Sequence, residues 1–323
     1  MRGLHGGPTK RAEVRAMRRG GFLLVMLGAF FLTLAPLTRF YVADKVVAAP
    51  LDFQQKVTLV AADASYYDLV TNKVKKGAEI TGELSLSGDV RNGTDEVLAL
   101  AGTYYLGQKD GQLALIEFQL SPDRRTGLLT NAAGANLDRD PSVRQTGYGL
   151  MLPIGEVERR TYQVFDLPTG RTWPAVFAGV ETVAGVTAFR FEQKVEPTLV
   201  AKSKKKVDPT VVGLPKKAKA VKIDRYYAST NTFWIDPRTG MPIKLRQDVD
   251  STLRTEDGHE GVFIRADLVT RDRDVRALAR RSEDYAANIT LVRVTLPTVA
   301  FGAGLVLLLA GGVLSLVGGS RKK

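Results

Sequence analysis

The sequence predicts an α+β membrane protein, in which two transmembrane helices flank a β-rich, antiparallel extracytoplasmic domain. Two uncharged apolar stretches lie near the ends of the chain, and between them run short segments rich in Val, Thr, Tyr and Phe. After residue 270 the apolar period changes from two to about three and a half residues, which is typical of a helix. With 323 residues, 44% of them apolar and 25% charged, the chain has the composition of a folded protein.

The N-terminal part is predicted to be a basic tail, residues 1–19, followed by a first transmembrane helix, residues 20–38, that acts as a signal anchor. The 19 residues of this helix carry no charge, and about 20 apolar residues cross a hydrocarbon core of ~30 Å. Six basic residues and one acidic residue precede Arg39, so the positive-inside rule places the tail in the cytoplasm. A signal peptide cleaved near residues 47–49 is the alternative, and Met17 is an alternative start of translation.

The second transmembrane helix is predicted over residues 294–320, which carry no charge, and a basic cytoplasmic tail follows at 321–323. Both termini are therefore expected in the cytoplasm, with the main domain outside the plasma membrane. The two tails hold +8 of the net charge of +12, which leaves +4 for residues 39–293. The high pI is thus a signal of membrane topology, and we expect no nucleic-acid partner.

Residues 39–270 are predicted to form the β-rich domain. Hairpins are expected at Asp110-Gly111, at residues 237–240 and at Asp257-Gly258, because Gly and Asp adopt the backbone angles that tight turns need. Residues 120–160 are rich in Arg, Asp, Gly and Asn, and we expect loops and one short helix there.

Residues 271–293 are predicted to form a stalk helix that continues into the second transmembrane helix. Apolar or small residues recur there at spacings of three and four, namely Val275, Leu278, Ser282, Tyr285 and Ile289. Pro297 lies inside the same pattern and is expected to kink the helix.

Small residues in the two spans could seat the helices against each other or against a helical partner in the membrane. Those in the first span are seven residues apart and those in the second are four apart: Gly21, Gly28 and Ala35, and Gly311, Ser315 and Gly319. The alternative is that Gly and Ala are simply common in membrane helices.

Residues 201–222 are predicted to be a protruding, mobile Lys-rich loop, because eight Lys and one Asp occur there together with two prolines. Such a loop could bind anionic lipid headgroups, a lipoglycan or an acidic envelope polymer. A solvated insertion that only keeps the protein soluble is the alternative. The lysines are Lys202, Lys204, Lys205, Lys206, Lys216, Lys217, Lys219 and Lys222.

Five aromatic residues are expected to fill the β core or, alternatively, to line a pocket for an apolar ligand. They are Trp173, Phe177, Tyr226, Tyr227 and Trp234.

The composition disfavours most enzyme classes. The chain has no Cys and only two His, His5 and His259, so it lacks disulfides, zinc-thiolate sites and Cys nucleophiles. No hydrolase, nucleotide or metalloprotease motif occurs. We therefore expect no catalytic residue, no metal and no cofactor.

Several segments together resemble the DUF3068, or PorA, family of actinobacterial envelope proteins. They are Leu34 to Leu37 with the following Arg-Phe-Tyr, Ala49 to Asp52, Phe165 to Pro174, and the Phe233 to Gly240 hairpin. The resemblance covers nearly the whole chain and implies an envelope location, together with a porin name. A membrane barrel needs strands with an apolar outer face, whereas these strands are flanked by charge. The Lys-rich segment looks like an elaboration of this sequence.

The sequence thus predicts a non-enzymatic envelope protein whose exported domain binds or transfers an apolar or anionic lipid-type ligand. This hypothesis requires a continuous apolar cavity or tunnel inside the β domain that opens toward the membrane. The alternatives are a structural or protein-interaction module with a solid core, a channel component, and an envelope hydrolase with converging carboxylates of raised pKa.

Overall fold

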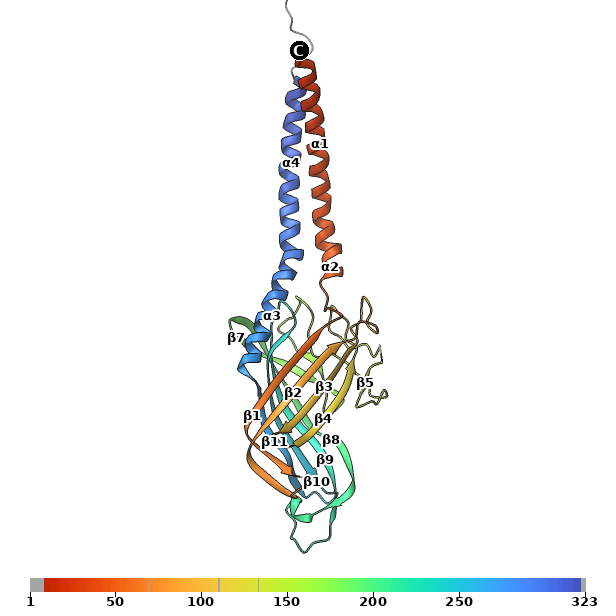
Figure 1. Cartoon of the computed structure of the whole chain (residues 1–323), viewed down its shortest axis with the longest axis vertical. Helices are drawn as coiled ribbons and strands as arrows, with labels where there is room; N and C mark the ends of the chain where they lie inside the picture. The colour runs from red at the N-terminus through yellow and green to blue at the C-terminus, as the bar shows by residue number, and fades with distance from the viewer. Residues whose placement is uncertain (1–8, 69, 110, 133, 321–323) are drawn as a thin grey trace, which may run out of the picture. The chain divides into compact units, whose positions relative to one another are not determined.

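The computed structural model describes residues 9–68, 70–109, 111–132 and 134–320 (Figure 1). The chain divides into two compact units, of which one comprises Met1–Val47 with Ala286–Lys323 and the other Ala48–Tyr285. We call the first the helical unit and the second the β unit.

Among the described residues of the helical unit, the long helices α1 (Thr9–Leu37) and α4 (Leu296–Ser320) have a length and composition that suit a membrane span. They pack closely through glycines. A Cβ atom on Gly21 would lie 2.9 Å from the Gly311 carbonyl oxygen, and one on Gly28 would lie 2.8 Å from that of Gly304. The small residues of the two spans therefore seat these helices against each other, while Phe22, Leu309 and other large apolar side chains remain exposed. The packing of Gly319 lies outside the description.

A π-helical segment accompanies the proline of each span. The segment Thr38–Val42 follows Pro36 and leads into α2 (Ala43–Val46), and the segment Leu291–Thr295 precedes Pro297. Because proline has no N–H, it disturbs the regular ladder of helical hydrogen bonds, and wider turns commonly form nearby. The helix predicted over the stalk is α3 (Asp272–Thr290), and the helical run continues through the second π-helical segment into α4.

The β unit is built on one antiparallel sheet of eleven strands in the order β5-β4-β3-β2-β1-β11-β10-β9-β8-β7-β6 (Figure 1). The strands are β1 (Gln54–Asp68), β2 (Lys73–Gly88), β3 (Leu100–Gln108), β4 (Gly111–Leu120), β5 (Asn136–Leu137), β6 (Tyr162–Asp166), β7 (Arg171–Val183), β8 (Val186–Val207), β9 (Val221–Ile235), β10 (Pro242–Arg254) and β11 (Glu260–Thr270). The three predicted hairpins are confirmed as β3–β4, β9–β10 and β10–β11. Gly240 and Gly258 supply the positive φ angles that their turns need.

The sheet curves into a half-barrel whose two edges are joined at one end. Ser121 and Asp123, beyond β4, pair with residues 128–130. That segment bonds to residues 147–149. There the Tyr148 N–H donates to the Gln163 carbonyl, and the Tyr148 carbonyl accepts from the Phe165 N–H on β6. We call this the closed end; Ala49 lies there, because its N–H donates to the Arg124 carbonyl.

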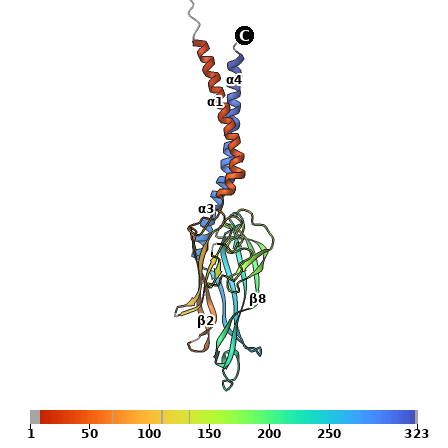
Figure 2. The ribbon, with the colours of Figure 1, turned by 90° about the vertical axis from the view of Figure 1, so that its right-hand side faces the viewer.

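At the opposite end, which we call the open end, the edges separate. β7 pairs with β8 only up to Gln193, and β5 pairs with β4 only at Phe118 and Gln119. The remainder of β8 pairs on one side only, with β9, among the residues described. Figure 2 shows β2 and β8 on opposite sides of the curve. A stretch of the wall between β4 and β8 is therefore left unclosed.

Helix α3 completes the wall where β11 ends. β11 stops at Thr270, opposite Leu59, so the first residues of β1 lose a sheet partner. The Thr58 N–H donates instead to Asp274 at 2.9 Å, and Arg281 donates to the Gln54 carbonyl at 2.6 Å. The helix thus satisfies backbone groups that a further strand would have bonded.

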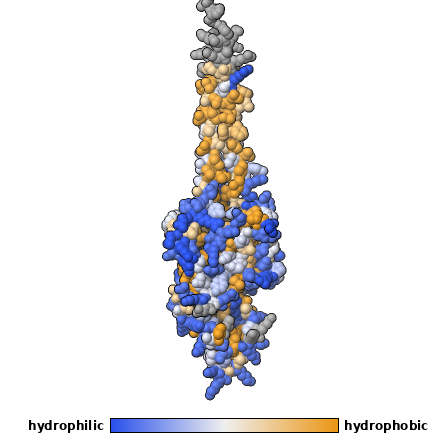
Figure 3. All heavy atoms as spheres, in the orientation of Figure 1, coloured by the Kyte–Doolittle hydropathy of each residue, from blue (hydrophilic) through white to orange (hydrophobic). Residues whose placement is uncertain are grey.

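The half-barrel is apolar inside and charged outside. Leu59, Ile80 and Leu268 point inward and are fully buried. Ion pairs cross the outer face between neighbouring strands, such as Lys56–Glu83 at 2.9 Å and Arg246–Asp267 at 2.7 Å. The visible face over the strands is mostly hydrophilic, whereas the two helices are apolar (Figure 3). The pattern is that of a water-soluble sheet and the reverse of a membrane barrel.

Two local predictions need correction. The described residues between 120 and 160 form loops, isolated bridges and β5, without the expected short helix. Residues 201–222 are not one protruding loop, because β8 extends to Val207 and β9 begins at Val221. Sheet pairing overrides the disorder that their composition predicts.

Candidate functional site

A column of polar side chains runs along the inner face of β9. Arg225, Tyr227, Ser229 and Asn231 alternate with residues of the outer face, and the last three are buried, whereas Thr230 is exposed. Alternate residues of a strand share one face, so the column faces into the half-barrel. Buried polar groups in an otherwise apolar interior are costly unless they have hydrogen-bond partners.

Asn231 belongs to a chain of hydrogen bonds that reaches β6. Its Nδ2 donates to Gln193 Oε1 at 2.9 Å, and Gln193 Nε2 donates to the Val164 carbonyl at 2.8 Å. Asp166, which ends β6, accepts from the N–H and the hydroxyl of Thr169 at 3.0 and 2.7 Å. Burial raises the pKa of Asp166 to about 6, although these hydrogen bonds and Asn231 favour its charged form.

A second polar link crosses the interior from the other half of the sheet. The Tyr104 hydroxyl on β3 donates to Gln247 Oε1 on β10 at 2.8 Å. Burial raises the pKa of both Tyr104 and Tyr227, and the charge of Asp166 raises each further. Both phenols are therefore neutral, and they serve as uncharged hydrogen-bonding groups.

Two buried atoms of the column accept no hydrogen bond among the residues described, Ser229 Oγ and Asn231 Oδ1. Such groups are rare in folded proteins and each costs about 1–3 kcal/mol, so they mark places where water or a ligand group belongs. The Ser229 hydroxyl still interacts with Tyr227, where it opposes the rise in the pKa of the phenol.

Arg225 is the charged member of the column. Its guanidinium lies over the Phe263 ring, 5.1 Å from the centroid, and burial lowers its pKa. No described carboxylate lies within ion-pair distance of it, although the more distant Asp138 raises its pKa through space. Leu253 and Ala201 flank it on the neighbouring strands. Among the residues described, this cation therefore has apolar neighbours on the flanking strands and no ion pair.

Partly buried apolar side chains surround the unclosed stretch of wall. Leu113 and Ala114 on β4, and Val200 and Val207 on β8, pack against the core and stay partly accessible. Ala114 faces inward, because it lies opposite the buried Leu106. We call these four residues the rim.

The five predicted aromatic residues do not form one pocket. Tyr227 alone belongs to the column. Phe177 stacks edge-to-face with Phe189 and Phe191, and Trp173 donates to the Thr169 hydroxyl at 3.1 Å. Trp234 and Tyr226 belong to the other phase of β9, where Trp234 donates to Glu181 at 2.7 Å beneath Lys244, and Tyr226 lies under Arg254. Tyr227 and Trp234 are buried in the core, and Trp173 and Phe177 pack against core clusters. Alternation along β9 places Tyr227 and Trp234 on different faces, and an apolar pocket lined by some of the five stays a prediction.

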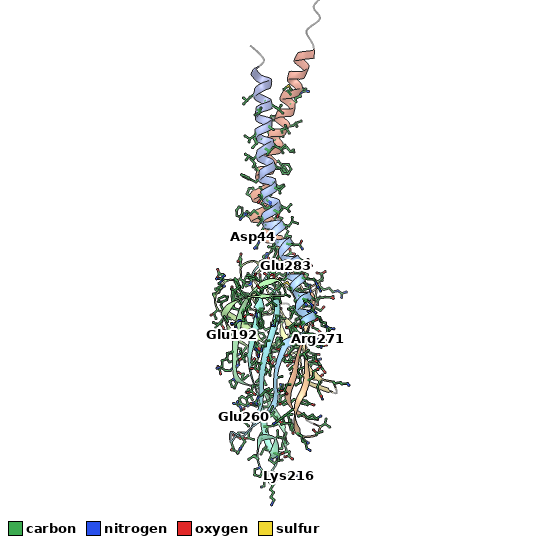
Figure 4. All side chains as sticks on the ribbon, turned by 90° about the vertical axis from the view of Figure 1, so that its left-hand side faces the viewer. Asp44, Glu192, Lys216, Glu260, Arg271 and Glu283 are labelled. Carbon is green, nitrogen blue, oxygen red and sulfur yellow. The ribbon has the colours of Figure 1, made fainter. Side chains whose placement is uncertain are left out.

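The predicted lysines gather at the open end, where a short cap joins β8 to β9. Asp208 accepts from the Thr210 N–H at 2.9 Å and starts the 3-10 turn Pro209–Val212, whose Val211 and Val212 are buried against the core. Lys216 lies at the end of the β unit remote from Arg271 and Glu283 (Figure 4). The exposed lysines are Lys202, Lys206, Lys216, Lys217, Lys219 and Lys222, and the side chains of Lys204 and Lys205 lie outside the description.

A separate surface hollow of about 430 Å³ lies near the closed end. Val157 and Tyr148 line it together with Glu158 and Arg160, which pair at 2.9 Å, and Arg160 also lies over the Tyr162 ring. Two of its charged groups, Glu158 and Arg160, are paired with each other.

Sequence reasoning missed the column because both phases of β9 are polar. Arg225, Ser229 and Asn231 alternate with Asp224, Ala228 and Thr230, so the pattern does not reveal which phase is buried. The polarity of a central strand was the only available signal.

The family model described as Porin PorA matches residues 20–313, nearly the whole chain, and the protein therefore belongs to this family. No curated protein matches the chain. The family name and the half-barrel are consistent with a channel or an envelope role.

Proposed function

We propose that this protein is a non-enzymatic, membrane-anchored binding protein of the cell envelope, whose half-barrel holds a lipid-type ligand. The observation that carries the proposal is the pairing of an apolar rim with polar groups that have no partner inside the same half-barrel. An amphipathic molecule would bury its chain against the rim residues and offer its polar end to the column.

In the proposed arrangement α1 and α4 anchor the protein in the plasma membrane, both termini are cytoplasmic, and the β unit is extracytoplasmic. The basic residues beside each span support this orientation. The charged outer face of the sheet supports an aqueous location for the β unit, because strands that cross a membrane expose apolar side chains to lipid.

Two rivals rest on particular observations. The edge of β8 that pairs with no second strand among the residues described could add a strand from a protein partner. The family name favours a channel component. A channel through the half-barrel would require displacing Tyr104, Tyr227 and the other side chains that fill it, which weighs against this rival.

The proposal is tested by mass spectrometry of lipids that co-purify with the full-length chain in a mild detergent. We expect a defined lipid at near-stoichiometric amounts in the native protein. Ala114→Trp would fill the interior at the rim and should lower recovery several-fold. Leu115→Trp, the neighbouring exposed position, is the matched control and should leave recovery unchanged. Recovery no higher than from the isolated α1–α4 spans, or unaffected by Ala114→Trp, would refute the proposal.

The orientation can be tested by cysteine labelling, because the chain has no native Cys. An impermeant maleimide applied to intact cells should label Lys217→Cys and leave Ala16→Cys unlabelled until the cells are broken. Labelling of Ala16→Cys alone would reverse the topology, and release of the protein by carbonate would remove the anchors.

A further inference from the structure

We infer that Arg225 binds the anionic headgroup of the ligand, so that the proposed lipid is an acidic one carrying a phosphate or a carboxylate. This inference rests on the proposed function and specifies the class of ligand. It starts from a contrast between Arg225 and the other arginines of the sheet.

Several other arginines of the sheet are paired with carboxylates. Arg246 contacts Asp267 at 2.7 Å and Arg265 contacts Asp250 at 3.2 Å on the exposed outer face, and the partly buried Arg190 contacts Glu181 at 2.8 Å. Pairing at an exposed position matters little for stability. Arg225 is partly buried like Arg190, where an unpaired charge costs more, and yet it has no ion-pair partner among the residues described. A position that favours a counter-ion therefore lacks one.

The surroundings of Arg225 leave its donors available. Phe263 covers one face of the guanidinium, and this cation–π contact recovers part of the lost hydration. The N–H groups of a guanidinium lie in its plane and can form two parallel bonds to a phosphate or a carboxylate. The flanking Leu253 and Ala201 offer no competing side-chain acceptor. The geometry therefore suits an anion that approaches in the plane of the guanidinium.

The chemistry beside Arg225 indicates that this anion carries an apolar chain. Val207 of the rim and the buried Ile223 lie on the same stretch of wall, and the cap packs Val211 and Val212 behind them. A free anion would gain nothing from these side chains, whereas an amphiphile would bury its hydrocarbon against them.

The open end also attracts anions. Lys206 lies directly opposite Lys222 in the β8–β9 register, and like charges in this arrangement are unfavourable. Lys216 and Lys217 are exposed on the cap nearby in the chain. These lysines would raise the local concentration of an acidic ligand and speed its arrival, with a strong dependence on salt.

The test measures binding of three probes to the full-length protein in a neutral detergent by isothermal titration calorimetry. The probes are dioctanoyl phosphatidic acid, uncharged dioctanoylglycerol and inorganic phosphate. We expect the native protein to prefer phosphatidic acid over dioctanoylglycerol at least tenfold. Arg225→Met should abolish this preference and leave dioctanoylglycerol binding intact, and Arg225→Lys should retain part of it because the charge remains without the forked donors.

The control is Arg265→Met on the exposed outer face, which should keep the native preference, and thermal unfolding shows that each variant is folded. Equal preference in the native protein and in Arg225→Met overturns the inference and leaves the proposed function standing. Failure of both lipids to bind the native protein overturns the proposed function itself. Inorganic phosphate binding as tightly as phosphatidic acid would overturn the lipid part of the inference, and the site would then belong to a soluble anion.

Discussion

The buried carboxylate Asp236 at the closed end of the half-barrel and the polar column toward the open end differ in how their polar groups are partnered. At the closed end Asp236 is fully buried, and both of its oxygens are bonded: Oδ1 to Arg238 Nε at 3.0 Å, and Oδ2 to Arg238 Nη2 and the Ser282 hydroxyl, each at 2.8 Å. Toward the open end Asn231 Oδ1 accepts no hydrogen bond, although Asn231 Nδ2 donates to Gln193, and Arg225 has no ion-pair partner among the residues described. The contrast separates fully bonded polar groups from groups with an unused hydrogen-bonding or charged atom.

The largest effect is expected at the closed end. Asp236→Ala should lower the free energy of unfolding by about 3–5 kcal/mol, because it leaves Arg238 and Ser282 with fewer partners in a buried network that ties α3 to the β9–β10 turn. Urea unfolding followed by tryptophan fluorescence measures it. Asp267→Ala, which breaks an exposed pair, is the matched control and should cost less than about 1 kcal/mol. Equal losses of unfolding free energy in the two variants would show that the buried network contributes no more to stability than an exposed ion pair.

The next effect concerns pH and Asp166. Because burial raises its folded-state pKa from 3.8 to about 6, the native state holds this proton more tightly than the unfolded state. Its contribution to stability is therefore full below pH 3.8 and declines as the pH rises to about 6, by about 3 kcal/mol in total.

Asp166→Asn cannot titrate, so the difference in unfolding free energy between the native protein and this variant should follow that curve. Measurement of both proteins from pH 3.5 to 7 isolates the contribution, since the other carboxylates are common to both. A difference independent of pH would show that the carboxyl of Asp166 is not desolvated.

Arg225→Met should behave unlike Asp236→Ala. Removal of the guanidinium leaves no described carboxylate without its partner. The unfolding free energy should therefore stay within about 1 kcal/mol of the native value or rise. Urea unfolding in the absence of added lipid measures this change. A loss above about 3 kcal/mol would place Arg225 with Asp236 among the groups that hold the fold.

The smallest effect is expected at the cap. Lys206→Glu converts the like-charged cross-strand pair with Lys222 into an opposite-charged one and should raise stability by about 0.2–1 kcal/mol. The gain should fade in 1 M salt, because both side chains are exposed. Lys244→Glu is the comparison. Native Lys244 lies opposite Trp234 in the register and stacks on its ring, so this substitution relieves no like-charge pair and no gain is expected.

The sequence predicted the elements whose signal is local. The two apolar spans, the three hairpins and the antiparallel character of the sheet followed from charge gaps, turn residues and period. The Lys-rich segment was mispredicted because its composition resembles a loop, while Val207, Val221 and the buried Val211 and Val212 draw it into the sheet and the core. Tertiary packing outweighed local preference there.

The candidate site lay beyond sequence reasoning for a different reason. Arg225 and Asn231 stand out only because of the residues around them. The local sequence pattern predicts neither the curvature of the sheet nor the register that places Arg225 beside Ala201 and Leu253. Asp166 was one of many carboxylates in the sequence, and only its burial distinguishes it. Whether a polar side chain lacks a hydrogen-bond or ion-pair partner depends on its three-dimensional surroundings, so a sequence motif cannot predict it.

Beyond Gln193, β8 pairs with β9 alone among the residues described, and this edge affects the tendency of the protein to aggregate. A strand whose backbone N–H and C=O groups face outward is a template for the strand of a second molecule and a starting point for aggregation. Lys202 and Lys206 hold exposed positive charge along this stretch, so two such edges repel each other before their backbones can pair. At the closed end, bridges between described residues join the two edges of the sheet. The lysines therefore lie along the part of the edge that could otherwise pair with a second molecule.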